Sequence, residues 1–431
     1  MEVRKRSAEI LYELEKKEAY LNILLRNRLP IYNLSINEKH LITELVYGVT
    51  RWRDTLDFIW RKYVKKNNLS LYAKILLRLV VYHVYFIRNT ILPIAINEIV
   101  EVAKEKAPRE VKLINAVARR IIENRNNVDL RSFPENLKYA IPDFILDEWD
   151  DYLGTTEKIK IASWSNRPQR FSLRVNTLKT NKEELKRELT KRSIDVEDGY
   201  LVDQALIVKN GVFLENLDLF REGYFIVQSE ASMLPALILN PKPGEKVIDL
   251  CSAPGLKSTH MAELMKNEGK IVSVDINKNR IGLVEENAKR LGVKIIETLN
   301  IDATSIPESF NGIFDKVLLD APCTGLGVLS HKPEIKWRLS KDQIYENSKL
   351  QLKILERAGK LVKRGGKILY STCTLTWSEN EGVVLSFLQN NPNFILEKFS
   401  YRYEEFNGIF RVLPYKYKTD GFFISLLSRE Y

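Results

Sequence analysis

The second half of the chain alternates short apolar runs with helix-forming segments, and this alternation limits the possible folds more than any other feature. From Pro241 onward we expect strands and helices in turn. Strands that are each followed by a helix favour a mostly parallel, doubly wound sheet with helices on both faces. The expected strands are Lys246–Cys251, Lys270–Asp275, Val293–Thr298, Phe314–Asp320, Lys367–Ser371 and Phe422–Ser428, and the expected helices are Lys257–Met265, Lys278–Leu291 and Lys341–Val362.

Polar residues collect where these predicted strands end, which is the edge at which open α/β sheets bind ligands. Asp275 and Asp320 end two of the strands, and Asp302 follows a third. The Asp275 carboxylate can accept both hydroxyls of a ribose, and Asn300–Asp302 is placed to read an adenine edge. The alternative for Asp275 is a cap on the N-terminus of the next helix.

The turn after the first strand reads Asp249-Leu-Cys-Ser-Ala-Pro-Gly-Leu-Lys257. This turn opens a helix, so its free backbone amides can meet a ligand at close range. It carries one glycine where a pyrophosphate-binding GxGxxG loop carries three. The sequence therefore disfavours NAD or FAD and favours a nucleoside cofactor without a phosphate.

The chain has three cysteines, Cys251, Cys323 and Cys373. No apolar leader is visible at the charged N-terminus, and three cysteines cannot all pair, so we expect free thiols in a reducing compartment such as the cytoplasm. Cys323 lies in the turn after one strand and Cys373 follows another. Local chemistry leaves open which of the two is a nucleophile. The four histidines are scattered along the chain, so no metal site is expected.

Residues 1–128 are predicted to be helical throughout, because apolar residues recur at spacings of three and four and Gly48 is the only glycine. Asn97 and Pro108 are expected to mark breaks between helices. The apolar stretch Leu71–Ile96 is interrupted by charges, which predicts buried helices and not a membrane span.

The net charge of +11 comes mostly from the N-terminal region, where residues 1–130 hold 24 Lys and Arg against 15 Asp and Glu. Such an excess suggests a polyanionic partner such as nucleic acid. The alternative is a solvated basic surface that aids solubility.

A basic and aromatic cluster lies within this helical region, at Thr50–Arg53 and Trp60–Lys66. Cations interleaved with aromatic rings suit RNA, because phosphates attract charge and unpaired bases stack on flat rings. The alternative is that Trp52 and Trp60 anchor the helical core while the cations face water. The candidate RNA contacts are Arg51, Arg53, Arg61, Lys62, Lys65 and Lys66, with Arg174 from the following region.

Residues 129–231 are predicted to form a small α/β, RRM-like module. Its expected helices are Ile141–Tyr152 and Asn181–Arg192, its expected strands are Phe171–Asn176, Leu201–Val202, Ala205–Val208 and Gly223–Gln228, and the helix Ser229–Leu239 leads onward. The predicted organisation is thus an all-α domain (1–128), this module (129–231) and a Rossmann-like domain (232–431).

Three motifs resemble the Sun (Fmu) family of RNA cytosine-C5 methyltransferases, which use S-adenosylmethionine: Asp249–Lys257, Asp320–Cys323 and Ser371–Cys373. The paired Pro-Cys and Thr-Cys motifs are highly specific. Further agreement lies at Leu173–Asn176, Val227–Gln228, Ala231–Ser232, His331–Trp337, Ser378–Glu381 and Asp420–Phe423.

The N-terminal region is similar to the NusB-type RNA-binding domain that some members carry, at Leu41–Arg53, Asn97–Glu101 and Asn115–Arg120. The resemblance therefore covers nearly the whole chain. The chain departs from the family at Leu256 and Ser229, where members often have Gly and Asp.

The resemblance implies a set of roles. Cys373 is expected to attack C6 of cytosine, Cys323 to assist release of the methylated RNA, and Asp320 to contact the N3 edge; DNA enzymes instead use the Pro-Cys cysteine. The cofactor residues implied are Cys251, Ser252, Ala253, Pro254, Gly255, Leu256, Lys257, Asp275, Asp302 and Asp320.

Small-subunit (16S) ribosomal RNA is the substrate that this resemblance favours, and tRNA stays open. Two competing hypotheses are a DNA cytosine methyltransferase and a non-catalytic RNA-binding or ribosome-assembly factor. We expect a cytoplasmic monomer whose partner is RNA, without DNA or a membrane.

Overall fold

The computed structural model describes residues 1–17, 19–65, 68–88, 90–168, 170–209 and 214–430. The chain divides into two compact units. One combines residues 1–147 with Leu329–Arg338, and the other combines Glu148–Val328 with Leu339–Tyr431.

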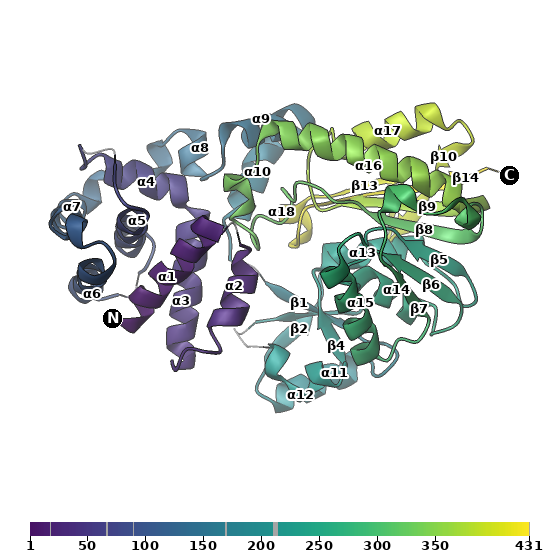
Figure 1. Cartoon of the computed structure of the whole chain (residues 1–431), viewed down its shortest axis with the longest axis horizontal. Helices are drawn as coiled ribbons and strands as arrows, with labels where there is room; N and C mark the ends of the chain where they lie inside the picture. The colour runs from purple at the N-terminus through teal and green to yellow at the C-terminus, as the bar shows by residue number, and fades with distance from the viewer. Residues whose placement is uncertain (18, 66–67, 89, 169, 210–213, 431) are drawn as a thin grey trace. The chain divides into compact units, whose positions relative to one another are not determined.

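The first unit is helical, and its helices form a bundle drawn in purple and blue (Figure 1). Seven of its helices carry the bundle, and short ones follow. They are α1 (Glu2–Lys17), α2 (Leu21–Arg28), α3 (Ile36–Arg51), α4 (Arg53–Arg61), α5 (Leu71–Tyr85), α6 (Leu92–Lys106), α7 (Val111–Glu123), α8 (Glu135–Lys138) and the beginning of α9 (Asp143–Leu153).

Helix α5 is the centre of the bundle, because it contacts α1, α3, α4, α6 and α7. Its buried residues are Ala73 and the nine consecutive residues from Ile75 to His83, which include Leu76, Leu79 and Val80. A helix that is apolar on nearly every face has to be buried. The prediction of buried helices in Leu71–Ile96 is thus confirmed for Leu71–Tyr85, whereas Ile91 and Ile94 are exposed. Within the described ranges, no helix is both long and apolar enough to cross a membrane.

The breaks between helices were predicted with partial success. Pro108 does separate α6 from α7. The prediction for Asn97 is wrong, because this residue lies inside α6. The helix begins earlier, at Leu92, with Pro93 in its first turn, where the missing N–H of proline carries no penalty.

A segment from the second half of the sequence completes the helical unit. Within Leu329–Arg338, Trp337 Nε1 donates to the Thr50 carbonyl (2.6 Å), and Glu334 Oε1 accepts from the Leu21 amide (3.0 Å). Glu334 is buried. The predicted boundary at residue 232 places this segment in the Rossmann-like domain, and that boundary does not indicate that it packs among the N-terminal helices.

The second unit begins with α10 (Thr155–Ser165) and a four-stranded antiparallel sheet in the order β2-β3-β1-β4. The strands are β1 (Phe171–Val175), β2 (Val196–Asp198), β3 (Ala205–Val208) and β4 (Phe225–Val227), with helices α11 (Lys182–Lys191) and α12 (Asp218–Arg221). The predicted strand at Leu201–Val202 is wrong, because both amides bond to the Glu230 carboxylate (2.7 and 2.8 Å) in place of a neighbouring strand.

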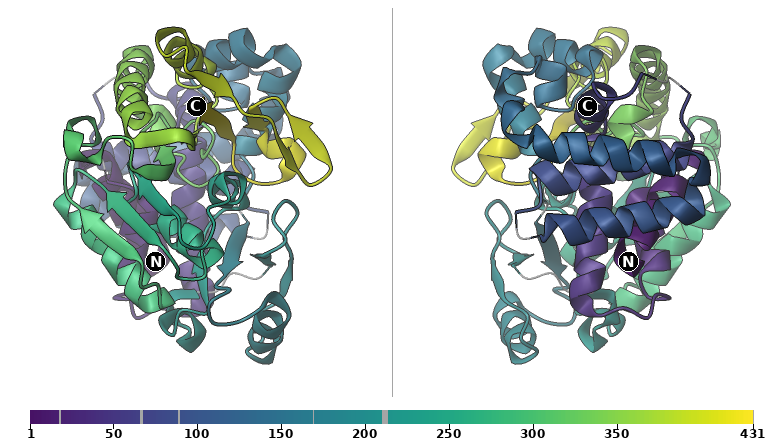
Figure 2. Two further views of the ribbon diagram at one scale, coloured as in Figure 1. Left: turned by 90° about the vertical axis from the view of Figure 1, so that its right-hand side faces the viewer. Right: turned by 90° about the vertical axis from the view of Figure 1, so that its left-hand side faces the viewer.

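The main sheet has eight strands, in the order β10-β14-β9-β8-β5-β6-β7 with β13 beside β14. Strands β5 to β9 are parallel, and β10, β13 and β14 form an antiparallel part, drawn in yellow (Figure 2). The bounds are β5 (Lys246–Asp249), β6 (Lys270–Val274), β7 (Ile296–Leu299), β8 (Phe314–Asp320), β9 (Val362–Thr372), β10 (Phe394–Leu396), β13 (Ile409–Val412) and β14 (Phe422–Arg429), and a separate hairpin holds β11 (Phe399–Tyr401) and β12 (Glu404–Phe406).

Both faces of this sheet are covered, as side-chain alternation along a strand requires. Val247 and Leu318 pack with helices α13 to α15, whereas Ile248 and Val317 pack with α16 and α17. The bounds are α13 (Glu230–Leu239), α14 (Leu256–Leu264), α15 (Lys278–Leu291), α16 (Lys341–Leu361), α17 (Glu381–Asn390) and α18 (Pro414–Tyr417). The predicted doubly wound fold is confirmed.

Strand β5 lies between β6 and β8, so the order of the chain reverses beside it. Ligands bind at such a point, beyond the carboxyl ends of the strands. The loops that follow β5, β6, β8 and β9 therefore converge on one edge of the sheet, which is where the candidate site lies.

Candidate active site

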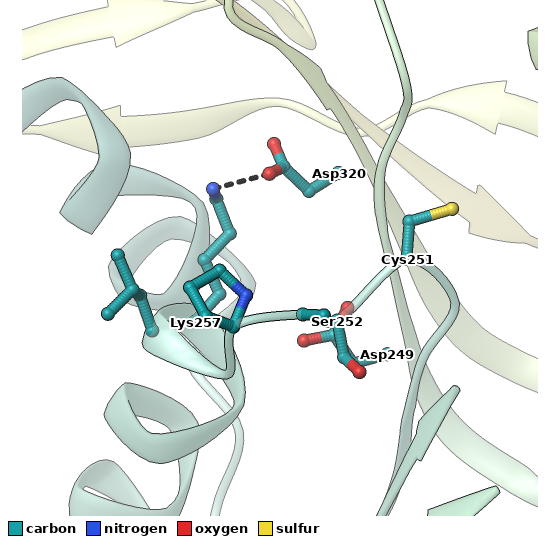
Figure 3. A pocket seen from close by; sticks show the side chains of 8 residues that line it. Asp249, Cys251, Ser252, Lys257 and Asp320 are labelled. Atoms are coloured by element: carbon teal, nitrogen blue, oxygen red, sulfur yellow. Dashed lines mark hydrogen bonds and ion pairs between the residues drawn. The ribbon is translucent and has the colours of Figure 1, made fainter. Parts of the chain in front are cut away.

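A pocket opens at this edge of the sheet, between the loop after β5 and the end of β8 (Figure 3). Its wall is the N-terminal turn of α14 together with the two strand ends. The residues that line it are Asp249, Cys251, Ser252, Ala253, Pro254, Leu256, Lys257 and Asp320. Seven of these eight were predicted cofactor residues, and the structure brings them together.

Lys257 and Asp320 face each other across the pocket, as the dashed line in Figure 3 shows. Lys257 Nζ lies 2.6 Å from Asp320 Oδ2 and 3.1 Å from Ser232 Oγ. The other carboxylate oxygen of Asp320 accepts from Ser371 Oγ (2.8 Å). Both oxygens of Asp320 are thus held, which fixes the carboxylate at the end of β8.

The hydrogen bonding of the Asp249 carboxylate shows whether a positively charged cofactor fits this pocket. Its Oδ2 accepts from Ser258 Oγ (2.6 Å), but its Oδ1 is buried without a hydrogen-bond partner among the described residues. Burial raises the pKa of Asp249 to about 7. A buried carboxylate oxygen without a partner is costly, and a cationic ligand would satisfy it. The residues present therefore fit the sulfonium cofactor that the sequence motifs imply.

The remaining predicted cofactor residues shape the pocket from outside its lining. Gly255 caps α14 with φ +92°, and a Cβ there would lie 3.0 Å from the Val284 backbone, so only glycine suits the turn. Asp275 accepts from the amides of Ala253 (3.2 Å) and Asn277 (2.9 Å).

Asp275 is not the cap of the next helix, which excludes that alternative. Asn277 caps α15, through its own side chain. Asp302 is half-buried and accepts from the amide and the hydroxyl of Thr304, both at 2.8 Å, so it caps a short 3-10 turn. Neither aspartate is among the lining residues of the pocket.

Cys251 lines the pocket, but its sulfur points away from the Lys257–Asp320 pair (Figure 3). Burial, with the neighbouring carboxylates, raises the pKa of the Cys251 thiol far above its ordinary value. A thiol that stays protonated is a poor nucleophile, so Cys251 is not expected to attack a substrate.

Cys323 and Cys373 come together, although fifty positions separate them in the sequence. Their Sγ atoms are 3.3 Å apart, and neither forms a disulfide. Gly327 makes the approach possible, because its amide donates to the Cys373 carbonyl (2.9 Å) and a Cβ there would lie 2.0 Å from the Gly421 carbonyl oxygen.

Either sulfur can donate in the hydrogen bond between Cys323 and Cys373. This bond, together with burial, raises the pKa of the Cys323 thiol well above its ordinary value. The two thiols are therefore close enough to exchange a proton directly.

Glu379 is a residue of the site to which the sequence analysis assigned no role. It is fully buried, and it accepts from the amide of Thr324 (2.9 Å), next to Cys323, and from Thr376 Oγ1 (3.0 Å), close to Cys373. It thus ties together the loops that carry the two cysteines. Its motif, Ser378-Glu-Asn-Glu381, resembles a surface loop in composition, so only the family resemblance indicated it.

The predicted RNA contacts divide into buried and accessible residues. Arg51 is buried and donates to the Ser330 carbonyl (3.1 Å), and Arg174 is fully enclosed. Neither guanidinium is placed to reach a phosphate, which corrects the assignment of both. Arg61, Lys62 and Lys65 are exposed.

The other members of the basic and aromatic cluster are also placed. Arg53 lies over the Trp337 ring (4.5 Å to its centroid), and Lys66 falls outside the described residues. Trp60 is buried and Trp52 packs against Phe86, so both tryptophans anchor the helical core. In the described part of the chain, no cluster of three or more histidine, cysteine or carboxylate side chains could hold a metal ion.

Comparison with known families agrees with this geometry. The family described as 16S rRNA methyltransferase RsmB/F matches residues 236–428, and the NusB family matches residues 1–123. The ferredoxin-like domain of RsmF/B-like methyltransferases matches residues 141–215.

Two relatives extend the comparison. The Bacillus subtilis (strain 168) protein named probable ribosomal RNA small subunit methyltransferase B is 35% identical, over 99% of each chain. The Pyrococcus horikoshii protein named tRNA (cytosine(72)-C(5))-methyltransferase is 39% identical, over 50% of this chain and 55% of its own.

Solved structures show the same architecture. The crystal structure of PH0851 has a TM-score of 0.86 and 32% identity, and the match covers 99% of this chain and 98% of that one. NSun6 from Pyrococcus horikoshii, solved with the S-adenosylmethionine analogue SFG, has a TM-score of 0.62 and 28% identity over 68% of this chain and 99% of its own.

These matches confirm the family that the paired cysteine motifs indicated. The NusB family matches helices α1 to α7 of the helical unit, and the ferredoxin-like domain matches strands β1, β2 and β3 of the four-stranded sheet. The methyltransferase family spans the main sheet that holds both cysteines and the pocket. The chain therefore belongs to the 16S rRNA methyltransferase RsmB/F family and is a methyltransferase.

Proposed function

We propose that this chain is an S-adenosylmethionine-dependent RNA (cytosine-C5)-methyltransferase that acts through a covalent bond between Cys373 and C6 of the target base. The observation that carries the proposal is the 3.3 Å separation of the Cys323 and Cys373 sulfurs at the edge of the sheet that holds the pocket. Two adjacent thiols after two neighbouring strands provide one group for attack and another for release. The name of the Pyrococcus horikoshii relative, a cytosine-C5 methyltransferase, supports the reaction.

The residues that line the pocket would hold the cofactor. Asp249 offers its unpartnered oxygen to the positive charge, and the turn from Ser252 to Lys257 forms the wall. When bound, S-adenosylmethionine supplies an electrophilic methyl group.

Cys373 makes C5 of cytosine reactive. Its thiolate adds to C6, which converts the ring to an enamine whose nucleophilic carbon is C5. Asp320, held by Lys257 and Ser371, contacts the N3 edge, toward which electron density moves during the addition. After C5 has been methylated, the C5 proton passes to solvent, its bonding electrons re-form the C5–C6 double bond, and Cys373 leaves C6 as a thiolate; Cys323 assists this release.

The target base must leave its stack to reach a covalent nucleophile, so the substrate is a single-stranded or locally opened RNA. Small-subunit ribosomal RNA is the first candidate, because the relative that matches over the full length of both chains carries that name. A tRNA is the second candidate. It is supported by the name of the Pyrococcus horikoshii relative, whose match covers 50% of this chain.

Adduct formation tests the covalent step. Incubated with S-adenosylmethionine and RNA that contains 5-azacytidine, the wild-type protein is expected to form a complex that survives denaturing electrophoresis. Cys373→Ala should abolish this complex, whereas Cys323→Ala should form a persistent complex even with unmodified RNA. If Cys323→Ala loses the complex and Cys373→Ala keeps it, the two roles are reversed. Glu346→Ala, at an exposed position of α16, is the control and should behave as the wild type.

The substrate is tested separately. Bisulfite sequencing of total RNA, from cells with and without the gene, is expected to show one or more cytosines in small-subunit ribosomal RNA that lose protection. Loss of protection in tRNA alone would favour the second candidate. Transfer of labelled methyl groups to DNA, and not to RNA, would contradict the proposal.

A further inference from the structure

Arg174 is the most deeply enclosed cation that the structure describes near the pocket, and the proposed reaction does not use it. It lies on β1, where Leu173 and Val175 belong to the core of the ferredoxin-like module. Since neighbouring residues of a strand point to opposite faces, the Arg174 side chain projects from the face opposite to that of Leu173 and Val175. Its side chain is fully buried, so it ends inside the protein and not at an RNA surface.

The guanidinium of Arg174 donates hydrogen bonds to one face of helix α14. Nη1 donates to the Leu256 carbonyl (2.5 Å), and Nη2 donates to Thr259 Oγ1 (3.0 Å) and to Glu263 Oε1 (2.8 Å). The three residues occupy positions i, i+3 and i+7, which lie along one side of a helix. A planar fork with several fixed donors can hold such a row, whereas a lysine cannot.

Two hydrogen-bonded routes run from Arg174 to the lining of the pocket. The first passes through Thr259, whose hydroxyl also donates to the carbonyl of Gly255 (2.7 Å), at the turn that opens α14. The second passes through Gln228, which accepts from Nη1 and donates to the Ser232 carbonyl (2.8 Å). Ser232 Oγ is in turn a partner of Lys257.

We propose that Arg174 is a positioning residue for the cofactor, which holds the Gly255–Lys257 turn in the shape that lines the pocket. It acts through the backbone of the turn and touches no substrate. The ferredoxin-like module therefore contributes to cofactor affinity as well as to any contact with RNA. This inference rests on the proposal that the pocket binds S-adenosylmethionine.

The choice of variants follows from the burial of the ion pair. Removal of Arg174 would leave Glu263 charged and uncompensated, which can prevent folding. Arg174→Lys keeps the charge opposite Glu263 but loses the fork. Thr259→Val keeps the shape of the side chain and the ion pair of Arg174 with Glu263, and it removes both the acceptor for Nη2 and the link to Gly255.

Calorimetry with S-adenosylmethionine and S-adenosylhomocysteine, together with KM values for both substrates, tests the inference. Arg174→Lys and Thr259→Val are each expected to raise the Kd for both cofactors by about tenfold, because small displacements of a preorganised site have large effects. The KM for RNA and its dependence on salt should stay unchanged. Arg170→Lys is the matched control: Arg170 precedes the same strand, is 54% exposed and pairs with Glu197, so its cofactor Kd should equal that of the wild type.

Three results would overturn the inference. A raised KM for RNA with an unchanged cofactor Kd would make Arg174 an RNA contact. Lowered thermal stability with an unchanged Kd in both variants would make its role structural only. If Arg174→Lys does not fold, an unchanged Kd in Thr259→Val has the same meaning. A wild-type protein that binds no cofactor would instead contradict the proposed function.

Discussion

At the scale of single residues, Asp249 links the chemistry of the pocket to pH. It is fully buried, and only Ser258 donates to it among the side chains described. Because burial raises the pKa of Asp249 to about 7, the carboxyl of the free protein is protonated in mildly acidic solution. A cationic cofactor binds the ionised form better.

We therefore expect the affinity for S-adenosylmethionine to rise with pH from about 6 to about 8 and then to level off. Asp249→Asn should remove this pH dependence and weaken binding at the upper end. Calorimetry across this pH range measures both effects. The effect of pH on folding stability has the opposite direction. Because the pKa of Asp249 in the unfolded chain is about 4, the free protein should lose stability as pH rises from about 4 to about 7. A slope that persists in Asp249→Asn would assign the titration to another group.

Gly327 determines how closely the two cysteine loops approach. The Cβ of an alanine at this position would lie 2.0 Å from the Gly421 carbonyl oxygen and 2.8 Å from that of Cys373. Backbone must move to admit it, so we expect Gly327→Ala to lower the free energy of unfolding by about 1–3 kcal/mol and to slow adduct formation. Chemical unfolding and the adduct assay measure the two effects.

The control for this change is Gly282→Ala. Gly282 lies within α15, and no atom within 4 Å would meet a Cβ there. Alanine in a helix interior is favoured over glycine by about 0.5–1 kcal/mol, so this variant should be as stable as the wild type or more stable. Equal losses in both variants would show that the close approach at Gly327 is unimportant.

At the scale of elements, the loop between β9 and α17 supports the loops of Cys323 and Cys373 through Glu379. Buried donors from Thr324, Thr376 and Gln351 all point to its carboxylate. Each donor that is left unpaired costs about 1–3 kcal/mol. Burial raises the pKa of Glu379, so the loop depends on these donors to hold the charge.

We expect Glu379→Ala to lower kcat by about a hundredfold, because the loops of both cysteines lose their shared acceptor. The KM for S-adenosylmethionine should change little. Glu379→Gln keeps one acceptor and should restore part of the rate, and Glu346→Ala, at an exposed position of α16, is the control. A fall in kcat without rescue by glutamine would point to the charge and not to the hydrogen bonds.

Long periodic elements were predicted better than short ones. The helices α15 and α16 and the strands β5, β6 and β8 follow the predicted ranges closely, because each carries several repeats of the apolar pattern. The strands β10 to β13 and the helix α18 have three or four residues each, too few to establish a period. The strands β10 and β13 form because they pair with β14, and β11 and β12 form because they pair with each other in a hairpin.

At the scale of the whole molecule, Leu329–Arg338 is the segment whose place is least apparent from the chain order. It follows the loop of Cys323 in sequence but belongs to the helical unit. Trp337 stacks with Arg53 and donates to Thr50, and Arg338 donates to the carbonyls of Leu14 in α1 and of Ala19, just after that helix. The N-terminal helices alone are therefore an incomplete folding unit.

We expect Trp337→Ala to destabilise the helical unit by about 3–5 kcal/mol, as truncation of a large packed aromatic does. Denaturant unfolding of the full chain, followed by circular dichroism, measures the loss. Trp377→Ala is the control, since Trp377 is 52% exposed and should change stability little. Equal stability of the Trp337→Ala variant and the wild type would show that the contacts of Trp337 do not stabilise the helical unit.

The order of residues alone indicated the fold class, the pocket-forming turn and the two cysteine motifs. Parallel strands bring their carboxyl ends to one edge, so polar residues that follow successive strands must meet there. The folded chain was needed for the contact between Cys323 and Cys373, the enclosure of Arg174 and Arg51, and the role of Glu379. Whether a charged side chain is buried depends on what packs over it from distant segments, and neither composition nor periodicity records that.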